Sequence, residues 1–140
     1  MKKVEQLWKK ILSNEPFFIA EAGVNHLGSL ELGEQLIKKA AESGAQAIKF
    51  QSYKAETLTT RNAPRFWDWD GEEKKDGSQF DTYKTLDSFG EQEHLELKKM
   101  CDRYGIEFMS TPFDFEAVDY LDRVGINAYK IASCDITNHP

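Results

Sequence analysis

The chain has 140 residues, of which 40% are hydrophobic and 30% charged, and its net charge is −6. This length suits one domain with a hydrophobic core, and the acidic excess argues against a nucleic-acid ligand. No apolar run is long enough to span a membrane and the amino-terminal lysines precede no signal-peptide core, so we expect a cytoplasmic protein without a membrane partner.

Strands and helices alternate along the sequence. A leading helix and turn are predicted over residues 1–16, and later helices end at glycines. Each of those glycines is soon followed by an apolar strand. The predicted strands cover 17–21, 45–52, 106–111 and 126–133. The alternation predicts a parallel sheet, either doubly wound or part of a (β/α)8 barrel. Because neither GxGxxG nor a P-loop occurs, nucleotide-binding versions of the open sheet are disfavoured.

A long polar excursion, residues 53–88, separates the second strand from the helix at 91–104. It has no clear period and contains the aromatic residues Phe66, Trp67 and Trp69. A loop of this length is usually either a functional lid or a disordered insertion. The aromatic residues favour an ordered, packed loop.

Polar side chains lie at the predicted carboxyl ends of the strands, which meet on one face of a parallel sheet. Two lysines, Lys49 and Lys130, interrupt otherwise apolar strands, where a lysine is costly to bury without an anionic partner. Together with the hydroxyls of Thr111 and Ser133 they predict a phosphate or carboxylate site. The alternative interpretation is a structural ion-pair network.

Glu21 ends the first predicted strand and has two interpretations. It forms a salt bridge with one of the two lysines, or it has a functional role, either as a general acid and base or as a carboxylate that orients a sugar hydroxyl or a metal-bound water. Asn25 and His26 follow in the next turn and, with Ser110, are candidates to line the site. His94 lies in a helix among charged residues, where we expect it to be solvated.

Four strings, IAEAGVNHLGS, AIKFQSY, STPFD and AYKIAS, occur in this order from about Phe17 to the end of the chain. In order and spacing they resemble the sialic acid synthase family, which includes N-acetylneuraminate synthase and its legionaminate, pseudaminate and spore-coat relatives. The resemblance implies a (β/α)8 (TIM) barrel that condenses phosphoenolpyruvate with an N-acylated amino sugar such as N-acetylmannosamine. It also implies a divalent metal, Mn²⁺ or Mg²⁺, and a homodimeric full-length protein.

By the same resemblance, phosphoenolpyruvate would be bound by Lys49, Thr111, Lys130 and Ser133. Glu21 would be the catalytic carboxylate, and Gln51 would face the sugar.

The sequence departs from the family in length, since residues 1–140 cover only about the first four βα units, a half barrel. The family's two metal-binding histidines lie on later strands, so no metal ligands are expected here. The second half of the barrel and the carboxyl-terminal antifreeze-like domain are also missing. We therefore expect an incomplete and inactive chain. Two other hypotheses stay open: a Schiff-base aldolase with Lys49 or Lys130 as nucleophile, and a non-catalytic half-barrel that self-associates.

Overall fold

Three parallel strands form the sheet in the order β1-β2-β3. The computed structural model describes residues 2–66 and 77–138. The strands are β1 (Ile19–Gly23), β2 (Ala47–Ser52) and β3 (Glu107–Pro112). The helices are α1 (Lys2–Ile11), α2 (Leu30–Glu42), α3 (Ala55–Leu58), α4 (Gln79–Leu86), α5 (Glu91–Tyr104) and α6 (Phe115–Val124), followed by a short 3-10 helix η1 (Ser133–Asp135).

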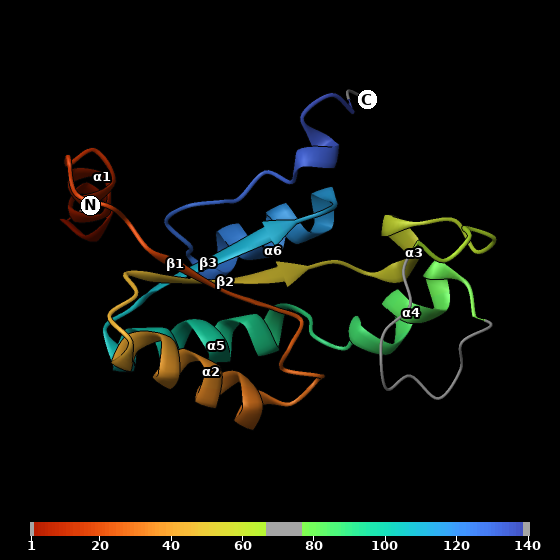
Figure 1. The fold of residues 1–140 in the computed structure, drawn as a ribbon, viewed down its shortest axis with the longest axis horizontal. Coiled ribbons are helices and arrows are strands. Elements are labelled where there is room, and N and C mark those ends of the chain that lie inside the picture. Colours follow the sequence, from red (N-terminus) through yellow and green to blue (C-terminus); the bar gives the residue numbers. More distant parts are fainter. Residues whose placement is uncertain (1, 67–76, 139–140) are drawn as a thin grey trace.

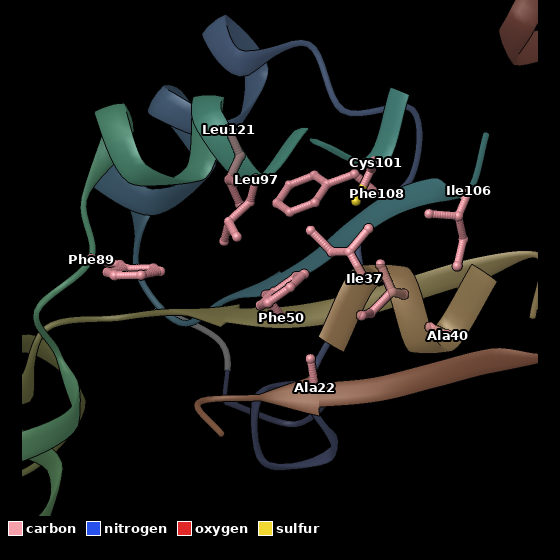
Figure 2. Close-up of a cluster of buried hydrophobic side chains, with 11 residues drawn as sticks. Ala22, Ile37, Ala40, Phe50, Phe89, Leu97, Cys101, Ile106, Phe108 and Leu121 are labelled. Atoms are coloured by element: carbon pink, nitrogen blue, oxygen red, sulfur yellow. The ribbon is translucent and has the colours of Figure 1, made fainter. Parts of the chain in front are cut away.

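The hydrophobic core lies between this sheet and its helices. Figure 1 shows α2 and α5 side by side along the same face of the sheet. Alternate strand residues such as Phe50 and Phe108 point into this layer, where they meet Ile37, Leu97 and Leu121 (Figure 2). Each of these side chains contributes about 1.5–3 kcal/mol on burial. The parallel α/β class predicted from the alternating pattern is confirmed.

Local signals in the sequence set the helix boundaries. The Ser29 side chain accepts a hydrogen bond from the Leu32 amide at the start of α2, and Asp114 does the same for Ala117 in α6. At the other end of α5, Gly105 adopts the left-handed conformation, with φ +68°, which glycine takes without strain.

The fourth predicted strand, 126–133, does not form, and this part of the prediction is wrong. Tyr129 makes one isolated parallel bridge to Ser110, the Lys130 amide donates to the Ser110 carbonyl at 3.0 Å, and η1 begins at Ser133. A strand needs repeated pairing with a neighbour, and Ile131 beyond the bridge is 58% exposed. The apolar pattern alone therefore predicted a strand where only one bridge forms.

The excursion after β2 carries two short helices, α3 and α4, which lie beyond the carboxyl ends of the strands (Figure 1). Its described parts form these helices, but Phe66 is 83% exposed, so the expectation that this aromatic residue packs the loop is wrong. Trp67 and Trp69 lie outside the described residues.

Membrane-spanning helices are not found among residues 2–66 and 77–138, where every helix is too short or too polar to cross a bilayer.

Candidate functional site at the carboxyl ends of the strands

A cleft of about 530 Å³ opens where β1 and β2 end. Glu21, Asn25 and Gln51 line it from the sheet side, and the excursion lines the opposite side through α3 and α4. In α/β proteins ligands bind at this end of parallel strands. The predicted catalytic residue Glu21 and the predicted sugar-facing residue Gln51 therefore share one cavity.

Lys49 lies beside this cleft on the sheet face opposite α2 and α5. It pairs in register with Glu21 on β1, and its Nζ lies 2.5 Å from Glu21 Oε2. The same Nζ donates to Thr111 Oγ1 at 3.4 Å. The Lys49 side chain is 14% exposed and that of Glu21 52% exposed, so the lysine is the desolvated partner. The predicted salt bridge of Glu21 is thus formed with Lys49.

The end of β1 is shaped by Gly23, whose φ is +54° and next to which the strand register shifts. A Cβ atom there would lie 3.2 Å from Glu21 Oε1 and 3.7 Å from Gln51 Nε2. Glycine at this position therefore lets both side chains occupy the cleft.

Lys130 and Ser133 follow the single bridge at Tyr129 and are exposed. The main chain of Lys130 adjoins β3 at Ser110, but its Nζ donates to the Ile131 carbonyl at 2.5 Å. The structure therefore brings Lys49, Thr111 and Glu21 together, whereas the side chain of Lys130 is turned to its own backbone.

Two of the candidate lining residues, His26 and Ser110, lie in the helix layer and do not line the cleft. The His26 ring stacks on Phe89 with 4.0 Å between ring centroids, and its Nδ1 accepts a hydrogen bond from the Gly28 amide at 3.1 Å. Burial, together with the charge of His94, lowers the pKa of His26 to about 4. His26 is therefore neutral at physiological pH.

His94 is buried at 1% exposure, so the expectation of a solvated side chain is wrong. Its Nδ1 lies 2.7 Å from the Gly90 carbonyl and its Nε2 3.4 Å from the Gln51 carbonyl, and the shorter contact favours the tautomer with the proton on Nδ1. Ser52 Oγ lies 2.9 Å from that Nε2 and 2.6 Å from Ser110 Oγ. Burial lowers the pKa of His94 as well.

Several cleft residues were not found from the sequence, among them Gln79, Thr82 and Tyr83 of α4 and Cys134 of η1. A signal for α4 exists, because Ser78 and Asp81 form a capping box at its start. That pattern places Gln79 at the first helical position.

A divalent metal does not fit the residues at hand. Over the described ranges, 2–66 and 77–138, no three His, Cys, Asp or Glu side chains are grouped so that they could hold an ion. We therefore derive no step of a reaction through a metal.

A parallel α/β sheet with a cleft at its strand ends defines an α/β protein and fits both architectures expected from the sequence, the open sheet and the (β/α)8 barrel. The NeuB family model matches residues 36–140, and the chain belongs to this family.

Relatives with established names support the assignment. The chain is 41% identical over 124 residues to the N,N'-diacetyllegionaminic acid synthase of Legionella pneumophila, a match that covers 89% of this chain and 35% of that protein. It is 30% identical to human N-acetylneuraminate-9-phosphate synthase, over 89% of this chain and 34% of that one. The chain thus spans about a third of the length of these relatives.

Solved structures agree. The N-acetylneuraminic acid synthetase of Leptospira borgpetersenii, determined in complex with citrate, superposes with a TM-score of 0.71 at 41% identity, over 89% of this chain and 39% of that one. The spore coat polysaccharide biosynthesis protein SpsE of Bacillus subtilis gives 0.61 at 33% identity, over 86% and 30%. The fold therefore matches part of the TIM-barrel enzymes of this family.

Proposed function

We propose that this chain supplies the phosphoenolpyruvate-binding wall of a nonulosonic acid synthase. The observation that carries the proposal is Lys49, a weakly exposed lysine between the carboxylate of Glu21 and the hydroxyl of Thr111. An ammonium and a hydroxyl at the open end of a parallel sheet suit a phosphate or carboxylate group. Membership in the NeuB family supports the same substrate.

The carboxylate of Glu21 lies beside Lys49, and an anionic ligand would bind next to it at the same lysine. When phosphoenolpyruvate binds, Lys49 and Thr111 hold one of its anionic groups, and Lys130 and Ser133 turn from the adjoining segment to hold the other. Glu21 then faces the reacting atoms, and Gln51 in the same cleft faces the sugar.

The proposed reaction joins C3 of phosphoenolpyruvate to the aldehyde carbon of an open-chain N-acylated amino sugar, such as N-acetylmannosamine. The aldehyde oxygen takes up a proton. Water adds to C2 and loses a proton, and phosphate leaves with cleavage of its C2–O bond. Glu21 is the residue positioned to hold or transfer a proton at these atoms.

The Schiff-base aldolase hypothesis has only the weak exposure of Lys49 in its favour. Such a lysine is activated by desolvation or by a cationic neighbour. Lys49 is instead paired with a carboxylate, and Lys130 is exposed. Self-association of a half-barrel, a homodimer of the full-length protein and a cytoplasmic location stay predictions.

A chimaera tests the proposed function. The present chain replaces the corresponding segment of the Legionella synthase, and phosphate release is followed with phosphoenolpyruvate, Mn²⁺ and an N-acylated amino sugar. We expect turnover, and a loss of at least about tenfold in kcat/KM on Lys49→Met, which removes a charge-assisted contact. The control is Lys99→Met, which removes an exposed lysine of α5 paired with Glu96.

A chimaera that unfolds cooperatively but releases no phosphate would contradict the proposal. So would full activity in the Lys49→Met variant.

A further inference from the structure

The excursion after β2 forms a wall of the cleft that is fixed to the body of the protein. The Asp87 carboxylate accepts a hydrogen bond from the Ala55 amide at 2.9 Å. Lys54 Nζ donates to the Asp87 carbonyl at 2.6 Å and to the Phe89 carbonyl at 3.1 Å. These bonds close the excursion at its base, so the side chains that α4 presents to the cleft have fixed positions.

The described side chains that this wall contributes to the cleft are uncharged, and Leu58, Gln79, Thr82 and Tyr83 are among them. On the sheet side the charged lining residue is Glu21, and its ion-pair partner Lys49 lies beside the cleft. The excursion side suits a neutral molecule with apolar carbons and hydrogen-bonding oxygens. A sugar has this character.

Gln79 has an unused hydrogen-bond donor at this wall. Its Oε1 accepts from the Phe66 amide at 3.1 Å, and because that partner only donates, the amide orientation is defined. Gln79 is 7% exposed, and within the described part of the chain its Nε2 has no hydrogen-bond partner. A buried donor without an acceptor is unfavourable, and a ligand that supplies an acceptor removes this cost.

We infer that Gln79 is a specificity-determining residue that donates from Nε2 to a neutral oxygen of the amino sugar. The inference rests on the proposed function and deepens it. The accepting oxygen belongs either to the N-acyl carbonyl or to a ring or chain hydroxyl, and both present the same neutral acceptor.

The experiment is a titration of the 140-residue chain with N-acetylmannosamine, and separately with mannose, followed by amide chemical shifts. Gln79→Met removes the donor without adding charge. Gln79→Glu removes the donor but keeps the oxygen that accepts from Phe66, so it covers the case in which Gln79→Met fails to fold. The matched control is Gln92→Met, an exposed glutamine of α5.

We expect the affinity for N-acetylmannosamine to fall by about fivefold or more in the Gln79 variants, the loss typical of one hydrogen bond, and to be unchanged in the control. If the affinity for mannose falls equally, the acceptor is a hydroxyl; if only N-acetylmannosamine is affected, it is the acyl carbonyl. Unchanged N-acetylmannosamine affinity in a folded Gln79 variant overturns the inference. If the unsubstituted chain binds neither phosphoenolpyruvate nor N-acetylmannosamine, the proposed function fails with it.

Discussion

At the scale of single residues, the site depends on the ion pair between Glu21 and Lys49. The two residues are register partners on adjacent parallel strands, so their side chains leave the sheet on the same face. If the ion pair is broken, the half-exposed Glu21 carboxylate is solvated by water at little cost in free energy. The weakly exposed Lys49 is instead left without a compensating charge. An anionic ligand compensates Lys49 in the same way, which is why the ion pair is compatible with a binding site.

Gly23→Ala is expected to destabilise the chain by about 1–2 kcal/mol, because alanine at a positive φ is strained. Its Cβ would also approach Glu21 Oε1 to 3.2 Å and displace the carboxylate. Urea unfolding measures the stability. Gly44→Ala is the control, since Gly44 also has a positive φ, +82°, but nothing lies within 4 Å of its Cβ position. Equal losses in the two variants would show that the approach to Glu21 has no effect, and no loss in either would contradict the argument.

At the scale of the elements, a buried polar network ties β2 and β3 to the start of α5. Ser110 donates to Ser52, Ser52 donates to His94 Nε2, and His94 Nδ1–H donates to the Gly90 carbonyl. These directions belong to the tautomer with the proton on Nδ1, which the 2.7 Å contact to Gly90 favours over the 3.4 Å contact of Nε2 to Gln51. The network holds together the two strands that carry Lys49 and Thr111.

The two buried histidines predict that stability depends on pH. In the unfolded chain a histidine binds a proton below about pH 6.5. In the folded chain the pKa of His26 is lowered to about 4, and that of His94 is also lowered. As the pH falls below about 6.5 the unfolded state therefore binds more protons, and stability decreases by up to about 1.4 kcal/mol per pH unit for each histidine.

Urea unfolding between pH 7.5 and 5 measures this slope. His26→Phe keeps an aromatic ring against Phe89 but does not titrate, so the slope should be reduced to the part due to His94. Stability that is independent of pH over this range would contradict the neutral assignment of both rings.

Elements with strong periodicity and end signals could be predicted from the sequence, whereas those that depend on tertiary partners could not. The helices α2, α5 and α6 have an apolar face with a capping residue or a final glycine. The segment 126–133 has an apolar pattern but only one bridge. His94 shared the spacing of Leu97 and Cys101 on α5, which would have indicated its burial.

At the scale of the whole molecule, the cleft has a sheet side with the ion pair of Glu21 and Lys49 at its edge and an excursion side with uncharged lining side chains. The sheet side was predictable, because carboxyl ends of parallel strands meet on one face and a lysine in a buried strand needs an anion. The excursion side was not, because the position of Gln79 follows from long-range bonds to Ala63 and Phe66. The chain matches about a third of its relatives' length.

The most direct test of anion binding is a titration of the chain with phosphoenolpyruvate, followed by ³¹P resonance and by calorimetry. We predict saturable binding that Lys49→Met weakens by about tenfold or more, as expected for a charge-assisted contact, and that Lys99→Met leaves unchanged. Equal affinity in the chain and in a folded Lys49→Met variant, or no saturable binding by the unsubstituted chain, would contradict the account.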